Sequence, residues 1–386
     1  MIQKIFAAGA GALIGATIAV LTRKRRMHNC HKEVLEYHND YVTLSQSERN
    51  KMKDRRNANR NRINKNLDNE DPKPIGFQTQ GSYSMLTMVL DQHNDYDIDD
   101  GIYYNKEDLV GSRGGELTPR QAKKIVCDAA QDNSFKRAPE IRTNCVRVYY
   151  NDGSHVDIPV YRKYVEEDFW GEEKEIFEIA GATWKQSDPK SVTGWFKDNN
   201  ISQSPDATNG RQMRRIVRLL KRFSRSRESW KSRIASGFVI TALVVECYKA
   251  DAERDDKALY DTMKSIHDRL VYDLEVNHPV LDEALTTGAD DAKTKFLREK
   301  LKGTLNRFDE LFDSSCDDAT ALEVWGGVFS SGFFFDKAKE AREENKAEID
   351  SMIAGKSEKA RKRHAAIAAT GLVSAASGYK PWAMVG

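Results

Sequence analysis

The sequence predicts an α+β protein, with strands in the first half of the chain and helices in the second. Residues 146–150 and 155–161 are rich in β-branched and aromatic side chains, and the segment NDGS at 151–154 separates them. This combination is typical of a β-hairpin. Beyond about residue 210 the apolar residues recur with helical spacing. Because strands precede helices and no internal repeat is found, we expect one α+β fold.

The other elements of the first half follow from local signals. A long polar helix is predicted for residues 44–67, because Ser45 or Ser47 can cap it and Glu48 supplies an acidic first turn. The prolines of the segment DPKP at 71–74 then interrupt the chain. Further elements are expected at residues 83–90 (a helix or a strand), 96–104 (a strand) and 119–130 (a helix).

A helix is predicted to begin at Pro189, with Ser187 as its cap. A loop rich in Ser, Asn, Pro and Gly follows at 200–210. The later helices are expected at residues 213–223, 238–248, 257–270, 292–312 and from 319 onward. The chain therefore divides into an apolar leader (1–30), a first domain (31–205), a helical domain (206–350) and a flexible tail (351–386).

Composition narrows the class of protein. The 386 residues are 39% hydrophobic and 31% charged, which suits a packed globular fold and excludes wholesale disorder. A net charge of +2 argues against a stable nucleic-acid partner, which would need a broadly basic surface. The five cysteines are scattered and show no metal-ligand spacing, so we expect reduced thiols in a cytoplasmic protein.

The N-terminus departs from this soluble pattern. Residues 5–21 form an uncharged run, and the basic segment RKRR follows at 23–26. Because the positive charge lies after the apolar run, the pattern fits an anchor in the inner membrane better than a cleaved signal peptide. The run is short and rich in alanine and glycine. A buried or disordered leader, or a start codon assigned too far upstream, are the alternatives.

Three acidic residues are the candidate metal ligands. Asp97 and Asp99 lie two residues apart on a predicted strand, so their side chains point to one face. Two carboxylates this close repel each other unless a cation lies between them, and magnesium suits such a pair. Asp157 lies between Val156 and Ile158 in the predicted hairpin, where an acid needs a partner. The alternative for Asp157 is a surface-facing position, because polar His155 shares its face.

A second feature lies upstream of the acids. Gly81 and Ser82 follow a polar segment and precede an apolar run. A glycine at this point lets the backbone approach a phosphate closely, and the following amides and the serine hydroxyl can bind it. Together with the carboxylates, this pattern indicates a site for a nucleotide phosphate and a metal.

These residues resemble a known family. The strings QGS at 80–82, DIDDG at 97–101, HVDIPVY at 155–161 and SDPK at 187–190, followed by Trp195-Phe196, are similar to the bacterial cGAS/DncV-like nucleotidyltransferases. Within them, the sequence is most similar to the Vibrio-type cyclic GMP-AMP synthases, over roughly residues 31–345. The apolar leader is not part of this pattern.

The resemblance implies a polymerase-β-like nucleotidyltransferase core, a mixed sheet with helices, packed on a helical C-terminal domain. ATP and GTP would bind between the two. Asp97, Asp99 and Asp157 would bind two magnesium ions and perform two-metal nucleotidyl transfer, making a cyclic dinucleotide for anti-phage defence. The alternatives are a linear oligonucleotide or nucleotide-tailing transferase and a membrane-tethered sensor without activity.

The resemblance also implies nucleotide contacts. Gln80, Gly81 and Ser82 would contact the nucleotide, and Arg147 corresponds to a position that can touch a base. Arg225 stands where a triphosphate-binding lysine is usual, and Ser236 lies near a phosphate-binding serine. The terminal Gly386 resembles the C-terminus through which such synthases can be attached to targets, in defence operons that encode a ubiquitin-like transfer enzyme. An arbitrary terminus explains Gly386 equally well.

Overall fold

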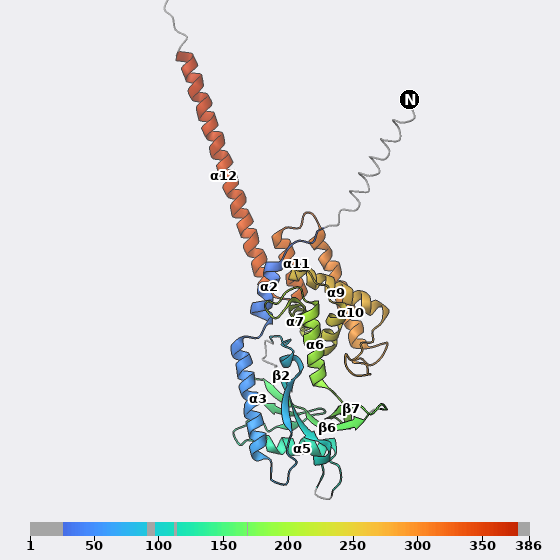
Figure 1. Ribbon diagram of the computed structural model, residues 1–386. Coiled ribbons are helices and arrows are strands. Elements are labelled where there is room, and N and C mark those ends of the chain that lie inside the picture. The colour runs from blue at the N-terminus through green and yellow to red at the C-terminus, as the bar shows by residue number, and fades with distance from the viewer. Residues whose placement is uncertain (1–25, 91–96, 112–113, 168, 377–386) are drawn as a thin grey trace, which may run out of the picture.

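Two hydrophobic cores organise the chain into a sheet lobe and a helical lobe. The computed structural model describes residues 26–90, 97–111, 114–167 and 169–376. In Figure 1 the helical lobe lies above the sheet lobe, and a long C-terminal helix leaves the body. The prediction of an α+β fold, with a mixed sheet and a helical C-terminal region, is confirmed.

The sheet is mixed and is built around one central strand. Its strands are β1 (Gly76–Gln80), β2 (Asp97–Asn105), β3 (Glu140–Ile141), β4 (Val146–Tyr149), β5 (His155–Ile158), β6 (Val160–Glu167), β7 (Glu173–Ala180) and β8 (Trp184–Gln186). Strand β1 runs antiparallel to β2, whereas β5 and β6 run parallel to it. The register is the same for both, since Asp97 pairs with His155 and Ile102 with Val160. Strands β5 and β6 therefore follow β2 as one line, interrupted at Pro159, which has no N–H to donate.

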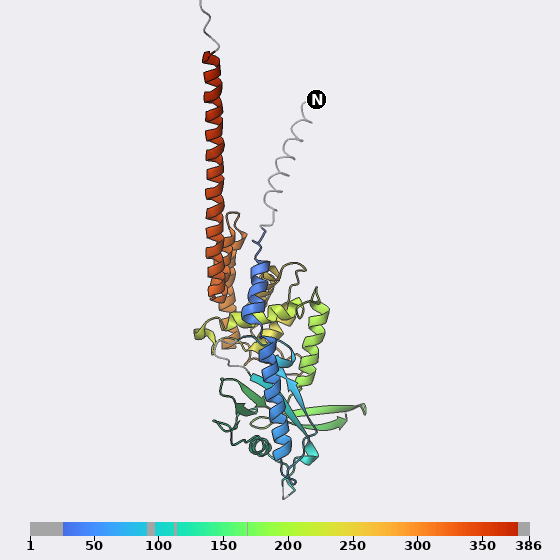
Figure 2. The ribbon, with the colours of Figure 1, turned by 90° about the vertical axis from the view of Figure 1, so that its left-hand side faces the viewer.

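The two faces of the sheet differ because side chains alternate along each strand. Ile98 and Ile102 of β2 point into a core that also contains Met52, Ile63 and Val126. These last three come from α3 (Gln46–Asn66) and α5 (Pro119–Ala129), which cover that face. Figure 2 shows α3 running along the sheet lobe. The opposite face carries Asp97 and Asp99 toward the helical lobe.

The helical lobe begins with an early segment of the chain. Helix α2 (His31–Tyr37), extended by a π-helical turn (His38–Val42), shares its core with the late helices. Those helices are α6 (Pro189–Gln203), α7 (Gln212–Ser224), α8 (Gly237–Cys247), α9 (Asp255–Tyr272), α10 (Ala292–Phe308), α11 (Asp318–Phe329) and α12 (Gly332–Ala376). The chain thus enters through the helical lobe, crosses to the sheet along α3, and returns along α6.

Most predicted elements appear close to their expected bounds. The Ser45 hydroxyl caps α3 by accepting a hydrogen bond from the Glu48 amide (3.2 Å). Ser45 was one of the two predicted caps. The cap of α6, however, is Asp188, which accepts from the Ser191 amide (2.9 Å), and the prediction of Ser187 was wrong. Residues 83–90 form neither a long helix nor a strand: α4 (Gly81–Ser84) ends at once, and Leu86 adopts a φ of 58°.

Helix α12 continues through residue 376 into the segment for which we predicted a flexible tail. Its side chains are exposed from Arg342 to Lys359, and Figure 1 shows it projecting from the body. The apolar run at 5–21 and Gly386 lie outside the described residues. Among the helices that the structure describes, none combines the length and the apolar character needed to cross a membrane. The five cysteines are free thiols.

Candidate active site

The candidate site begins where β1 ends. Gly81 has a φ of 65°, a left-handed conformation that favours glycine. A Cβ at this position would collide with the carboxylate oxygen Oδ2 of Asp99. The backbone therefore passes directly against Asp99, and only glycine allows this approach. Gln80, just before it, donates from Nε2 to the hydroxyl of Tyr161 (2.8 Å).

A row of polar side chains crosses the sheet at this level. Strand register places Gln80 of β1 beside Asp99 of β2, Asp99 beside Asp157 of β5, and Asp157 beside Arg147 of β4. Two residues earlier on β2 and β5, Asp97 pairs with His155. All of these point to the face opposite the α3–α5 core, because neighbouring strands in register share their pleat. The three predicted acids are therefore adjacent in the fold, although they are 60 residues apart in the chain.

Asp99 is buried close to two other acidic side chains. Burial raises the pKa of Asp99 well above its usual range, and the nearby charges of Asp97 and Asp157 raise it further. Arg147 opposes this rise. Two acids next to a buried third one create a local excess of negative charge, which a bound cation would relieve.

Arg147 is paired with Asp157. Its Nε and Nη2 donate to the two carboxylate oxygens of Asp157, each at 2.7 Å, in a bidentate ion pair. Such a fork fixes the orientation of the carboxylate. We predicted that Arg147 contacts a nucleotide base; that role stays a prediction, and the contact that the structure shows is with Asp157.

The donor atoms around these acids fit a divalent metal ion. One ligand atom each of Asp97, His155 and Asp157 lies within 4.8 Å of the others. Carboxylate oxygens suit magnesium, and an imidazole nitrogen is a common ligand of transition metals such as manganese. His155 had no assigned role in the sequence, although it lies two residues before Asp157 and so shares its face. That spacing is the signal that could have identified it.

A cavity of about 400 Å³ opens beside the Gln80 and Asp99 end of the row, and Asp157 is not among its lining residues. Sheet-lobe residues line one side, and α6, α7 and α8 line the other. Its lining includes Gln80, Gly81, Ser82, Asp97, Asp99, Tyr161, Asp188, Lys221, Arg225, Phe238 and His278. Most of the predicted site residues therefore meet at one cavity between the lobes.

Lys221 is a lining residue that the sequence analysis missed. It lies on α7, its ammonium nitrogen donates to the Thr87 hydroxyl (2.9 Å), and it is buried. Burial lowers the pKa of Lys221 to about 7, and nearby Arg225 also lowers it. Among the described residues no carboxylate lies at hydrogen-bond distance from this ammonium group, and a buried cation without such a partner is costly. An anionic ligand in the cavity would offset that cost.

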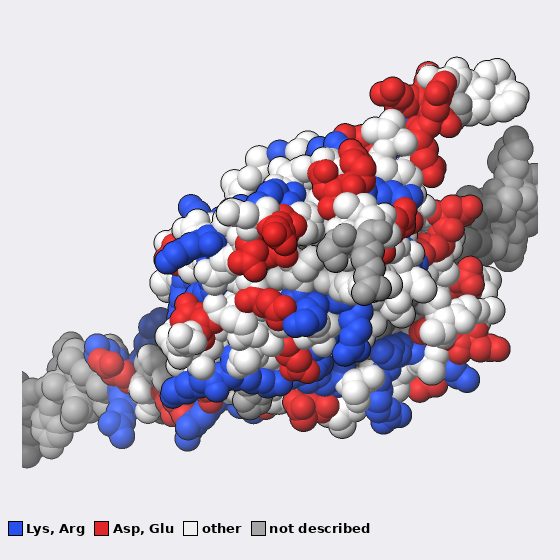
Figure 3. All heavy atoms as spheres, turned by 90° about the horizontal axis from the view of Figure 1, so that it is seen from below, with Lys and Arg blue, Asp and Glu red and all other residues white. Residues whose placement is uncertain are grey.

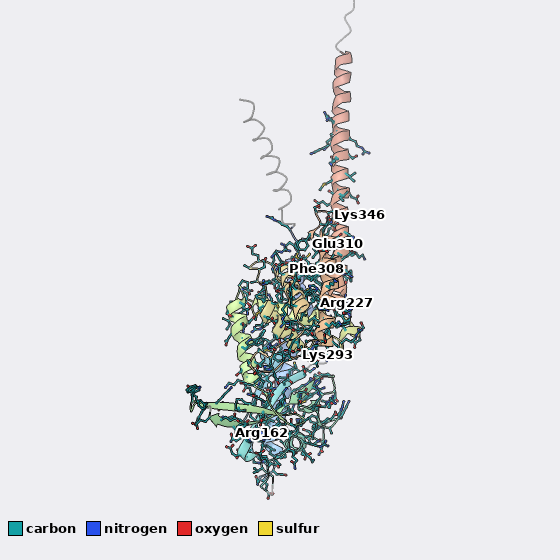
Figure 4. All side chains as sticks on the ribbon, turned by 90° about the vertical axis from the view of Figure 1, so that its right-hand side faces the viewer. Arg162, Arg227, Lys293, Phe308, Glu310 and Lys346 are labelled. Atoms are coloured by element: carbon teal, nitrogen blue, oxygen red, sulfur yellow. The ribbon has the colours of Figure 1, made fainter. Side chains whose placement is uncertain are left out.

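A second cavity of about 400 Å³ adjoins the first, and Asp97, Arg225 and Gly237 line both. Arg147, His155, Ser236 and Lys293 also line it. In Figure 4 Lys293 lies where the helical lobe meets the sheet lobe. Ser236 caps α8, because its hydroxyl accepts from the Val239 amide (3.3 Å). Arg225 and Ser236, both predicted phosphate ligands, thus face these cavities.

Comparisons with known proteins agree with this geometry. Residues 75–161 match the family described as cyclic GMP-AMP synthase DncV-like, nucleotidyltransferase domain. That segment contains Gln80, Gly81, Ser82 and the three acids. The match therefore covers the sheet-lobe half of the site.

Solved structures share the fold over most of the chain. Vibrio cholerae DncV cyclic AMP-GMP synthase, in complex with the linear intermediate 5′ pppA(3′,5′)pG, is 17% identical, with a TM-score of 0.61 over 79% of this chain and 96% of that one. The Vibrio cholerae enzyme with GTP and 5MTHFGLU2 is 16% identical, with a TM-score of 0.62 over 81% and 99%. Escherichia coli DncV, in its 3′-deoxy GTP bound form, is 17% identical, with a TM-score of 0.58 over 76% and 96%.

Proposed function

Because residues 75–161 match the DncV-like nucleotidyltransferase domain and the chain shares the fold of DncV structures, we propose that it joins ATP and GTP into 3′,3′-cyclic GMP-AMP or a close relative. The product would serve as a second messenger in bacterial anti-phage defence. The observation that carries this proposal is a cavity lined by Asp97, Asp99, Gly81 and Lys221, with Asp157 beside Asp99 on the neighbouring strand. The proposed metal ligands Asp97 and Asp99 and the groups that would donate hydrogen bonds to phosphate thus line the same cavity.

We assign two magnesium ions to Asp97, Asp99 and Asp157, with His155 as a neighbouring donor. When bound, divalent metal lowers the pKa of an attacking hydroxyl and neutralises charge at the transferred phosphate. The protein's own part is to hold the carboxylates on two adjacent strands, at fixed register, so that they share one face of the sheet.

Phosphate binding falls to the residues around the cavity. The backbone at Gly81, the hydroxyl of Ser82 and the ammonium group of Lys221 line the same space. Arg225 adds a second cation at the border of the two cavities. We propose that these groups hold the triphosphate of the nucleotide whose α-phosphorus is attacked, with pyrophosphate leaving.

Asp157 would accept the proton of the attacking ribose hydroxyl. Its two oxygens both accept hydrogen bonds from Arg147, which fix the orientation of the carboxylate. Each carboxylate oxygen has a second lone pair, so Asp157 can accept the hydroxyl proton while Arg147 holds the carboxylate in place. This ties Arg147 to the reaction even though it need not touch the phosphate.

Two adjoining cavities match the need for two nucleotides. Each is about 400 Å³, and Asp97 lies at their border. A donor nucleotide in one and an acceptor in the other would both reach the same carboxylates. A linear intermediate that turned over in this space would then present its second hydroxyl to the same row, and a second transfer would close the ring.

The proposal is tested by product analysis. The purified protein is incubated with magnesium and labelled ATP, labelled GTP or both, and the products are treated with phosphatase. A phosphatase-resistant product that requires both nucleotides supports a cyclic GMP-AMP synthase. A ladder of longer products would instead support the linear transferase, and no incorporation from any mixture would contradict catalysis by this chain.

A further inference from the structure

Strands β6 and β7 extend beyond the sheet as an acidic arm, which we define as residues 165–175. The sequence of the arm, VEEDFWGEEKE, contains six acidic residues and one lysine. In Figure 1 the arm projects on the right, on the side of the sheet lobe away from α3. Figure 3 shows acidic side chains gathered on the projecting element at the upper right.

The tip of the arm is aromatic. Phe169 is 92% exposed and Trp170 is 84% exposed, and their rings pack edge to face with centroids 5.3 Å apart. Val165, at 52% exposed, adds apolar surface at the base. Two large aromatic side chains presented together on a projecting hairpin are typical of an interaction site, because such residues supply much of the contact energy of protein interfaces.

A surface of complementary chemistry lies elsewhere on the same lobe. We define the basic groove as the cavity of about 400 Å³ lined by Lys136, Arg137, Arg147, Tyr149, Tyr150, Asn151, Gly153 and His155. It combines three cationic side chains with two tyrosines, and two of the cations already have acidic partners, since Arg147 is paired with Asp157 and Arg137 with Glu140. The guanidinium of Arg137 lies 3.6 Å from the centroid of the Tyr149 ring, so the groove already holds a cation stacked on an aromatic face.

The arm cannot reach the groove of its own chain. The groove is at the start of β5, near His155, whereas the arm begins at the far end of β6, near Glu167, and β5 and β6 run as one line along β2. Twelve residues of extended strand span roughly 40 Å. The turn beside the groove is also tied to α3 through Arg55 and Asp152, on the side of the lobe opposite the arm.

We propose that the aromatic tip of the acidic arm docks into the basic groove of a second copy of this chain. The acids of the arm, chiefly Glu166, Glu167, Glu172 and Glu173, would meet Lys136 and Arg137. Because the two contact surfaces differ and lie at opposite ends of a strand, the association is head-to-tail. Such contacts build open chains, or rings if the rotation closes.

The groove borders the candidate active site, since Arg147 and His155 line both the groove and the second cavity. A docked arm would therefore contact residues that also line the candidate active site. By linkage, nucleotides that bind near Arg147 would change the tendency to associate, and association would change nucleotide affinity by the same factor.

The test uses two variants that each remove one surface. Phe169→Ser/Trp170→Ser disables the arm, and Lys136→Glu/Arg137→Glu disables the groove. Analytical ultracentrifugation of the full chain should show concentration-dependent assembly of the wild type, weakened by added salt. Each variant alone should be monomeric. Mixed together, they should form a 1:1 heterodimer that does not grow, because one intact arm meets one intact groove.

A matched control separates this from general surface effects. Val271→Ser/Tyr272→Ser removes two other exposed apolar side chains, 52% and 90% exposed, at the end of α9, and should assemble like the wild type. Thermal unfolding checks that each variant is folded. A wild type that stays monomeric at several hundred micromolar would overturn the proposal, and the arm would then serve a different protein. Variants that assemble like the wild type, or that fail to pair when mixed, would also overturn it.

Discussion

At the scale of single residues, the site depends on a few positions where the neighbouring atoms restrict which side chain can be present. The acids Asp97, Asp99 and Asp157 and the turn at Gly81 could be predicted, because strand periodicity and a glycine before a hydroxyl are local signals. Lys221 could not. It is one of several cations on an amphipathic helix, and its partner Thr87 is 134 residues away in the chain. No local signal says which of these cations is buried against the cavity.

Gly81→Ala should remove activity while leaving the protein folded. The added methyl group would collide with Asp99, and the left-handed backbone would be strained by about 1 to 2 kcal/mol. Displacing a carboxylate by 1 Å can cost about 100-fold in rate. Steady-state turnover of Gly81→Ala beside Gly76→Ala measures this effect, since the space around Gly76 is open. Equal turnover of the two variants would contradict the assigned role.

His38 should make the protein sensitive to mild acid. Its Nε2 faces the Arg218 guanidinium (3.4 Å), and burial lowers the pKa of His38 to about 4 from 6.5. Between pH 6.5 and 4 the unfolded chain binds a proton that the folded chain does not, so stability falls as the pH falls. The loss should approach about 3 kcal/mol at pH 4 and change little below it. In His38→Gln, urea unfolding from pH 7 to 4 should show a shallower decline. The same slope as in the wild type would refute this.

At the scale of elements, α3 is attached to the sheet by a buried ion pair. Arg60 donates from Nε to the Asp100 carboxylate (2.7 Å), and Asp100 is only 2% exposed. Asp100 points away from Asp97 and Asp99 because of strand alternation, so the same acidic segment serves the fold on one face and the chemistry on the other. The sequence alone did not distinguish Asp100 from its neighbours.

Arg60→Met should therefore destabilise the protein by about 3 kcal/mol, because it leaves a buried charge unpaired. Lys51→Met on the same helix removes a partner of Asp152 from an exposed ion pair, and should cost less than about 1 kcal/mol. Chemical denaturation of the two variants gives the comparison. A loss in Arg60→Met no larger than in Lys51→Met would show that Asp100 is stabilised by other groups.

Individual helices and the hairpin were predictable, whereas the pairing of strands was not. The turn at 151–154 and the cap of α3 are encoded within a few residues. The parallel alignment of β5 and β6 on β2 joins segments 58 residues apart, and no local pattern reports it. Strands β7 and β8 were missed by the sequence analysis. The outer half of β7 lies in the exposed arm, and its glutamates interrupt the alternation of apolar and polar residues.

At the scale of the whole molecule, the site exists only because two lobes face each other. The sheet lobe supplies the carboxylates and Gly81, and the helical lobe supplies Lys221, Arg225 and Ser236. The path of the chain, which starts in the helical lobe and returns to it, holds the two cores together. Composition indicated a chain large enough for this arrangement, but the position of the cleft follows from long-range packing.

The central claim is that this cleft performs metal-dependent nucleotidyl transfer with the three acids. Asp97→Asn/Asp99→Asn keeps the shape of both side chains and removes their charge. The most direct measurement is product formation from labelled ATP and GTP by this variant and the wild type, with nucleotide binding followed by calorimetry in parallel. We expect binding to persist through Lys221 and Arg225 while the phosphatase-resistant product disappears. Full product formation by the double variant would contradict the claim.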